Sequence, residues 1–364
     1  MKALQIYDAQ PEPDLEQVAR YVNAVDAMGK YHFDRGDAQT ALGYYQRGAK
    51  LVEDAVGPNS RDLVPELMHL AEAEVRLRRP EVAIEHLDRC LDLLSRDSDN
   101  PVVARIYRLI GTAHFSLDEM VEAERAFADA LRVAERSLPD DHPMIPRLKA
   151  NMAAVAGTVG DNARAESLLI EALRPGTLPR PSQAVHMRNL GALQLRMGRP
   201  TDAEVTLNAA LALEPGNESY GALRTRKWLA QVQAATGHYG EGVEHFQELI
   251  RLQEAAHVGD PSIPGETRYD LAAMHSQYGD FHAAGSVLDD AASAFESSGD
   301  TLDVASALIE AGHAYQQARD QRRAETRYRR VSELISLLEG TGRPEEAEWL
   351  RAQLAAVDTA LLPP

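Results

Sequence analysis

The segment GTAHFSLDEMVEAERAFADAL, residues 111–131, decides the fold of this chain. It sets small and large residues at fixed distances: Gly111 lies twelve positions before Ala123, and Phe127 lies four positions after it. On two antiparallel helices, the small residues permit close approach and the large residue fills the seam between them. The segment therefore predicts a helix–turn–helix unit.

The same register recurs eight times, at intervals of 38 to 42 residues. Its anchors, the positions equivalent to Ala123, are Ala41, Ala83, Ala123, Ala165, Ala203, Gly242, Ala284 and Ala324. The residue twelve positions before each anchor is Gly or Ala, and the residue four positions after it is large and apolar or aromatic. Turn signals such as Gly36-Asp37 and prolines such as Pro101 separate the helices. Because one helix pair cannot bury its apolar face alone, successive pairs must stack into a solenoid.

The composition limits the function and the location. Acidic side chains outnumber basic ones by 56 to 38, a formal net charge of −18, which disfavours nucleic acid and anionic membranes as partners. No run of 18 apolar residues occurs, and the segment MKALQIYDAQPEPD (1–14) lacks the apolar stretch of a secretory signal. Cys90 is the single cysteine, which excludes an intramolecular disulfide and suits a reducing compartment. We expect a soluble cytoplasmic protein.

The segments 111–131 and 191–215 resemble tetratricopeptide repeats. Units near 42 residues, with joints at 138–153 and 259–272, resemble the kinesin-light-chain variety, which has a longer second helix. The resemblance covers about residues 14–340. It implies an all-α fold, a right-handed superhelical α-solenoid of about eight helix–turn–helix units.

Three segments are expected along the chain. Residues 1–13 form an irregular N-terminal segment, residues 14–340 form the repeat solenoid, and residues 341–364 form a capping helix with a tail. The cap follows from apolar residues at helical spacing, Ala347 and Leu350 among them. It would cover the open end of the eighth repeat.

Motifs of the common enzyme classes are absent from the sequence, including HExxH, the P-loop, GxSxG, GxGxxG and CxxC. Cys90 falls where other repeats carry small or apolar residues, which predicts a buried and unreactive thiol. His32, His114 and His275 each lie nine residues before an anchor, which indicates a packing role. The histidine pairs within 238–282 lack a carboxylate or thiol at ligand spacing, so we expect no metal site and no cofactor.

The resemblance implies that the first helix of each unit lines a concave groove. Its exposed inner positions lie 18, 15 and 14 residues before the anchor, on one helix face. In the four middle repeats, six of the eight residues at the first two positions are basic and none is acidic. Arginine forks bind carboxylates bidentately, and asparagine amides hydrogen-bond a peptide backbone. The predicted ligand-binding residues are Arg105, Arg108, Arg147, Asn151, Arg188, Asn189, Arg224, Lys227, Trp228 and Gln231.

These residues predict a non-catalytic interaction scaffold or adaptor that binds an acidic peptide or a carboxylate-bearing partner in a basic groove. The charges have a second interpretation, in which the arginines pair with acidic residues of adjacent units and stabilise the solenoid. The alternative function is a peptide-responsive regulatory sensor that acts through a partner protein. A remote alternative is an enzyme with the groove as substrate cradle and with His69 and His313 as acid–base groups. Open end repeats also make a homo-oligomer one expected assembly.

Overall fold

The irregular segment predicted over residues 1–13 lies outside the part of the chain that the computed structural model describes. That part comprises residues 15–96, 99–174, 178–216, 219–255 and 262–358. Its regular elements are all helices, and they come in consecutive pairs. The first helices of the pairs are α2 (Leu15–Asp34), α4 (Val64–Arg76), α6 (Pro101–Ser116), α8 (Met144–Thr158), α10 (Arg180–Arg196), α12 (Tyr220–Thr236), α14 (Ser262–Gln277) and α16 (Thr301–Gln317).

The second helices are α3 (Ala38–Val56), α5 (Pro80–Leu94), α7 (Met120–Ser137), α9 (Asn162–Ala172), α11 (Pro200–Leu213), α13 (Tyr239–Ala255), α15 (Phe281–Ser298) and α17 (Gln321–Gly340). A short 3₁₀ helix, η1 (Arg61–Leu63), leads into α4, and α18 (Pro344–Asp358) follows the last pair. The predicted all-α repeat solenoid is confirmed. The domain boundaries expected at residues 14 and 340 stay predictions.

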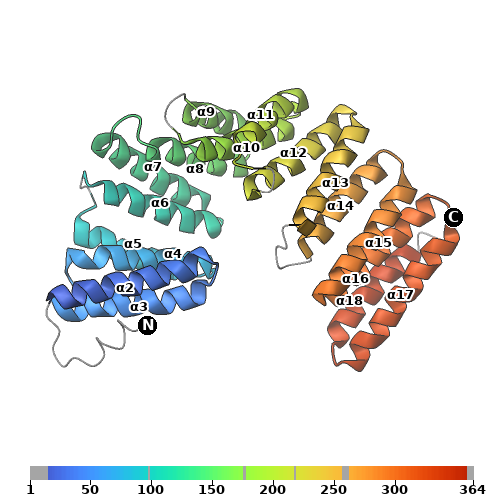
Figure 1. Ribbon diagram of the computed structural model, residues 1–364, viewed down its shortest axis with the longest axis horizontal. Helices are drawn as coiled ribbons and strands as arrows, with labels where there is room; N and C mark the ends of the chain where they lie inside the picture. The colour runs from blue at the N-terminus through green and yellow to red at the C-terminus, as the bar shows by residue number, and fades with distance from the viewer. Residues whose placement is uncertain (1–14, 97–98, 175–177, 217–218, 256–261, 359–364) are drawn as a thin grey trace. The chain divides into compact units, whose positions relative to one another are not determined.

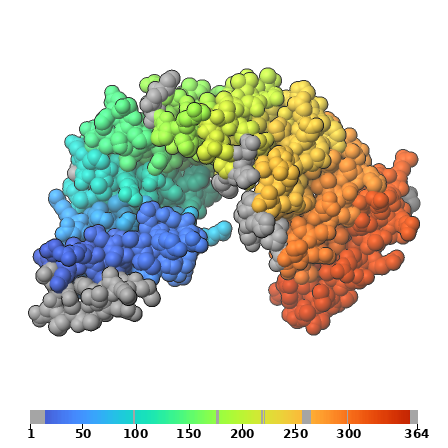
Figure 2. Space-filling model, viewed as in Figure 1, coloured from blue at the N-terminus to red at the C-terminus, as the bar shows by residue number. Residues whose placement is uncertain are grey.

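The chain divides into two units, Met1–Pro179 and Arg180–Pro364, which we call unit 1 and unit 2. In their described parts, unit 1 holds α2 to α9 and unit 2 holds α10 to α18. Within each unit, every helix packs against the next helix along the chain (Figure 1). The repeats of a unit follow one another as layers, which the colour bands of Figure 2 show. This stacking buries the apolar faces that a single helix pair leaves open.

The seam inside each pair has the packing that the sequence register predicts. A Cβ atom built on Gly111 would lie 2.7 Å from Cδ1 of Phe127, so the aromatic ring occupies the space that the glycine leaves. The same contact joins Gly29 to Tyr45 in the first repeat. The anchor Ala123 is fully buried between the two helices. Small and large residues therefore interlock across the seam, repeat after repeat.

The turn between the helices of a pair is also repeated. Five residues before each anchor the backbone takes a left-handed conformation, with a φ of 87° at Gly36 for example. Three repeats place a non-glycine residue there: Arg78 (φ 61°), Asp118 (φ 62°) and Arg319 (φ 61°). An L-residue in this conformation costs about 1 kcal/mol or more, which the packing of the flanking helices must offset. The second repeat, which lacks a turn glycine, thus keeps the same turn.

The helix α18 lies against the last helix pair of unit 2. It packs against α16 and α17, and its Ala347 and Leu350 are fully buried. Trp349 lies on the opposite side and is 47% exposed. Across the described residues, no helix combines the length and the apolar character that crossing a membrane requires.

Cys90 lies in the core of unit 1. It is fully buried, and its Sγ lies 3.7 Å from the carbonyl oxygen of Val64. Burial raises the pKa of the thiol to about 12, so the reactive thiolate is scarce at neutral pH. The predicted burial of Cys90 is confirmed.

Candidate ligand-binding site

Three of the predicted ligand-binding arginines lie close together in unit 1. Arg105 and Arg108 are one turn apart on α6, and Arg147 occupies the matching position of α8. The charges of Arg105 and Arg147 both act on the guanidinium of Arg108. Arg105 is exposed and Arg108 is half-buried, on the same face of α6 as the buried Leu109.

The positive charge of this cluster exceeds the negative charge beside it. Glu72 of α4 accepts a hydrogen bond from Arg105, with 2.9 Å between Nη2 and Oε1. Arg108 is half-buried, and burial, followed by the charge of Arg147, lowers the pKa of its guanidinium. Among the described residues, neither Arg108 nor Arg147 has an ion-pair partner. An anionic group that contacted both would relieve their mutual repulsion.

An open pocket of about 260 Å³ lies beside this cluster, lined by residues of η1, α4, α5 and α6. Its walls are mainly apolar and include Met68 and Val102, while Arg61, His69 and Arg105 bring polar groups. The volume is slightly below that of typical small-molecule pockets, which start at about 300 Å³. It suits one large apolar side chain next to an anionic group held by the arginines.

Arg188 of α10 has a different environment. Its side chain is 6% exposed, and its Nη1 lies 3.1 Å from Oε1 of Glu214 and 3.2 Å from the carbonyl oxygen of Gly221. Glu214 is buried as well and accepts a second hydrogen bond from Ser219. The prediction that Arg188 lies exposed in a groove is wrong, because the side chain is buried and forms an ion pair with Glu214 at the end of α11.

The other basic residues predicted in unit 2 lie on α12. Arg224 is exposed, and Lys227 forms an ion pair with Asp270 of α14, with 2.6 Å between Nζ and Oδ2. Gln231 lines an open pocket of about 230 Å³ together with Asp270. The second interpretation of the charges, pairing between adjacent repeats, therefore describes Lys227.

The aromatic and amide residues of the predicted set are divided between the units. Trp228 is half-buried and packs against a small core that includes Leu207. Asn189 is exposed on α10 of unit 2. Asn151 is half-buried on α8 of unit 1, one turn after Arg147. Of the amide residues predicted as ligand contacts, Asn151 therefore lies on the same helix as a cluster arginine.

The histidines at the position nine residues before the anchor are engaged inside the fold. His32 lies 3.2 Å from the carboxylate of Asp37, and His114 lies 2.6 Å from that of Glu119. Both carboxylates belong to the start of the following helix. His275 is buried, and burial lowers the pKa of its imidazole.

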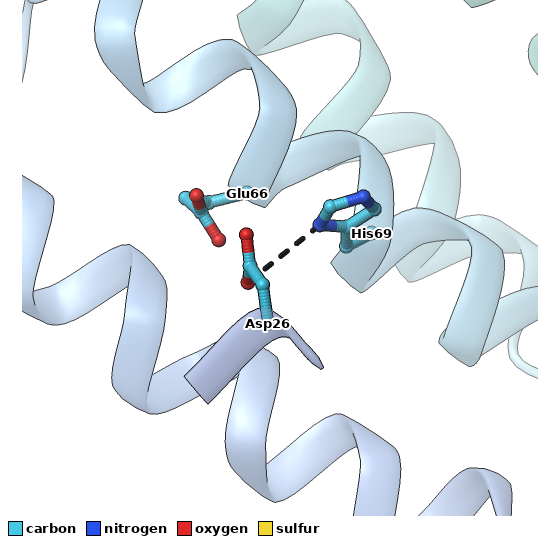
Figure 3. A group of neighbouring side chains, drawn as sticks. All are labelled: Asp26, Glu66 and His69. Carbon is cyan, nitrogen blue, oxygen red and sulfur yellow. Dashed lines mark ion pairs between the residues drawn. The ribbon is translucent and has the colours of Figure 1, made fainter. Parts of the chain in front are cut away.

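The structure also brings together three residues that the sequence did not connect. Asp26 of α2 lies beside Glu66 and His69 of α4, and their potential ligand atoms all lie within 4.8 Å of one another (Figure 3). Glu66 and His69 are three residues apart on one helix, a spacing that is visible in the sequence. The approach of α2 to α4 is a tertiary contact between repeats, which no local pattern signals.

These observations define the chain as an α-solenoid of helix–turn–helix repeats. Residues 63–136 and 102–175 match the tetratricopeptide repeat family. Residues 63–175 therefore contain tetratricopeptide repeats, and the other helix pairs of the described chain have the same helix–turn–helix form. A comparison with curated protein sequences gave no match.

Solved structures with the same fold are distant in sequence. The chain is similar to the apo form of the quorum sensor NprR from B. thuringiensis, with a TM-score of 0.64 and 14% identity over 91% of each chain. It is similar to a Rap protein complexed with Competence and Sporulation Factor, with a TM-score of 0.50 and 15% identity over 88% of this chain and 99% of the other. A tetratricopeptide repeat protein from Parabacteroides merdae has a TM-score of 0.50 and 17% identity over 80% of this chain and 98% of its own.

Proposed function

We propose that the protein is a non-catalytic interaction module that binds an acidic peptide segment or a carboxylate-bearing partner, and that unit 1 holds the binding site. Arg108 and Arg147 contact the anionic group, and Asn151 contacts the backbone next to it. The pocket beside Arg105 takes a neighbouring apolar side chain. The cytoplasmic location expected from the sequence stays a prediction.

One observation carries the proposal: Arg108 is half-buried beside two other guanidinium groups, and Glu72 is the carboxylate that opposes them. Such a cation gains by contact with an anion, and a hydrogen bond to a charged group contributes about 1.5–3 kcal/mol. The fold similarity to a quorum sensor, and to a Rap protein in complex with Competence and Sporulation Factor, supports a ligand-binding role for a solenoid of this kind.

The test is a binding titration with a defined probe. The probe is a fluorescein-labelled peptide with one leucine between acidic residues and a free carboxyl terminus, followed by fluorescence anisotropy. The double variant Arg108→Gln/Arg147→Gln should lose about tenfold or more in affinity at low salt, because two charge-assisted hydrogen bonds disappear. The affinity of the wild type should fall as salt rises, and that of the variant should fall less.

The matched control removes the same charge elsewhere on unit 1. Lys50 of α3 and Arg125 of α7 are exposed on second helices, so Lys50→Gln/Arg125→Gln changes the net charge equally and leaves the cluster intact. It should bind the probe within about twofold of the wild type. Equal losses in the two double variants would show that net charge, not the cluster, governs binding.

A regulatory sensor that acts through a partner protein is the second candidate. The observation in its favour is the fold similarity to NprR, which extends over 91% of both chains. Repeat solenoids change curvature readily because each repeat contacts only its neighbours. Small-angle scattering with and without saturating probe peptide separates the two: a sensor changes its radius of gyration, whereas a static scaffold keeps it.

A further inference from the structure

We propose that Asp26, Glu66 and His69 form a binding site for one divalent transition-metal ion, with Zn²⁺ as the reference ion, which joins α2 to α4 in unit 1 (Figure 3). The ion would connect the first repeat to the second at the N-terminal end of the described solenoid. His69 also lines the pocket beside Arg105, but the metal proposal does not depend on peptide binding.

The geometry is close to that of a coordination site. In Figure 3 the carboxylate of Asp26 lies between the side chains of Glu66 and His69. Asp26 Oδ1 lies 3.8 Å from His69 Nδ1, and all three ligand atoms lie within 4.8 Å of one another. Zinc ligands at about 2.0–2.2 Å from the ion lie about 3–3.6 Å apart, so small side-chain rotations suffice to complete the site.

Three atoms that face the site lack hydrogen-bond partners within the described residues. Glu66 is 3% exposed, and its Oε2 has no hydrogen-bond partner within the described residues. The same holds for Oδ1 of Asp26 and Nδ1 of His69. Buried polar atoms are nearly always hydrogen-bonded, so three such atoms aimed at one point require an explanation. One cation would satisfy all three at once.

The surroundings favour a positive ion. Glu66 is 3% exposed and lies beside the carboxylate of Asp26, and two adjacent carboxylates in a buried setting are unfavourable without a proton or a cation between them. Gly48 of α3 keeps the approach open, because a Cβ there would lie 2.9 Å from Glu66 Oε2 and 3.4 Å from Asp26 Oδ1. Tyr45 stacks on His69 with 5.0 Å between ring centroids and orients the imidazole.

The donor set selects the class of ion. One imidazole nitrogen and two carboxylate oxygens suit zinc, manganese and related transition metals. Ca²⁺ requires six to eight oxygen ligands, and Mg²⁺ prefers carboxylates with several waters, so neither gains from the histidine. Glu66 also lines an open pocket of about 320 Å³ with Asn23 and Asp62, which gives an ion a route from solvent.

The experiment measures zinc bound to the full chain. The protein is stripped with a chelator, dialysed against Zn²⁺ at a fixed free concentration and assayed for metal. We expect one Zn²⁺ per chain in the wild type, about 100-fold weaker binding in Glu66→Gln and in His69→Gln, and no displacement by millimolar Ca²⁺ or Mg²⁺. The control variant His114→Gln removes a histidine that also has a carboxylate neighbour, Glu119, and should bind zinc like the wild type.

Three results would overturn the proposal: no bound zinc in the wild type, as much zinc in the two ligand variants as in the wild type, or as large a loss of zinc in His114→Gln as in the ligand variants. The first would mean that the two carboxylates share a proton instead. Amide hydrogen exchange without zinc shows whether the Glu66→Gln protein is folded. With zinc, amide exchange in α2 and α4 should slow in the wild type and stay unchanged in folded Glu66→Gln. Exchange that is slowed equally in both proteins contradicts the site.

Discussion

Basic residues at equivalent positions of the repeats have opposite surroundings in the two units. In unit 1, the charge of Arg147 acts on Arg108, and the nearby carboxylate of Glu72 already pairs with Arg105. In unit 2, Arg188 is buried against Glu214, and Lys227 is paired with Asp270. The residue type at a position is therefore not what decides between a ligand contact and a structural ion pair. The acidic residues that the fold places beside it decide it.

The cores of the two units differ in the same way. Unit 1 has one large apolar cluster from α2 to α8 and a small one around Tyr21 and Val25, and the buried polar residues of its described part are Glu66 and Glu74. The core of unit 2 is divided into several smaller clusters. Between them lie buried polar side chains: His186, Arg188, Gln194, Thr225, Gln233, Thr267 and His275. Unit 2 thus depends more on specific polar pairing, and single substitutions there should have larger effects on stability.

The largest effect is expected from Glu214→Ala. The substitution leaves Arg188 buried without its partner, and breaking a buried ion pair in this way costs about 3–5 kcal/mol. The chain has two reporters for the comparison. Both tryptophans, Trp228 and Trp349, lie in unit 2, and the single cysteine, Cys90, lies in unit 1. In Glu214→Ala, the unfolding transition followed by tryptophan fluorescence should shift to a lower urea concentration. At that urea concentration Cys90 should still be protected from a thiol reagent.

A double substitution provides the control for this result. Arg188→Met with Glu214→Leu removes both charges and keeps apolar volume, so it should recover most of the lost stability. If Glu214→Ala shifted the unit 2 transition by less than about 1 kcal/mol, the pair would be as weak as an exposed one. Loss of Cys90 protection at the same urea concentration would show that the units unfold together and that the comparison between them fails.

A smaller loss of folding stability is expected from Gly111→Ala in unit 1. The new Cβ would lie 2.7 Å from the ring of Phe127, which is buried and cannot move away freely. Overpacking of this kind costs about 1–3 kcal/mol. The loss should appear as earlier exposure of Cys90 to the thiol reagent in urea.

Gly43→Ala is the matched control within the same unit. Gly43 is exposed on α3, and a Cβ there would meet no atom within 4 Å. Alanine is the better helix former, so this variant should gain about 0.5–1 kcal/mol. Opposite signs for the two substitutions would confirm that the seam, not helix propensity, requires glycine at 111. Equal gains would contradict the close packing.

The sequence predicted the fold in detail because the decisive contacts are local. Gly111 and Phe127 belong to one helix pair, so their spacing in the sequence reports their contact directly. The turn of the second repeat was harder to see, because Arg78 takes the left-handed conformation that elsewhere belongs to glycine. The two flanking helices impose that conformation, which the residue itself does not favour.

The sequence predicted the site less well because its contacts join different repeats. The partner of Arg105 is Glu72, 33 residues away, and no fixed register places acidic residues opposite basic ones. Arg188 looked like Arg108 in the sequence, and only the fold shows that Glu214, at the end of the partner helix α11, reaches it. Asp26, Glu66 and His69 escaped notice for the same reason, since α2 and α4 belong to different helix pairs.

The smallest effect is expected when the acidic partners of Arg105 and Lys227 are neutralised, and it is measured as a change in peptide affinity. Glu72→Gln releases Arg105 in unit 1, and Asp270→Asn releases Lys227 in unit 2. An exposed ion pair contributes up to about 1 kcal/mol, so the acidic probe peptide should bind Glu72→Gln about two- to fivefold more tightly. Asp270→Asn should leave the affinity of the unit 1 site unchanged and add a second, weaker binding event, which titrations in the Arg108→Gln/Arg147→Gln background isolate. If Asp270→Asn in that background binds no probe peptide, a freed Lys227 alone does not bind an acidic ligand. Binding in unit 1 would then depend on the half-buried setting of Arg108.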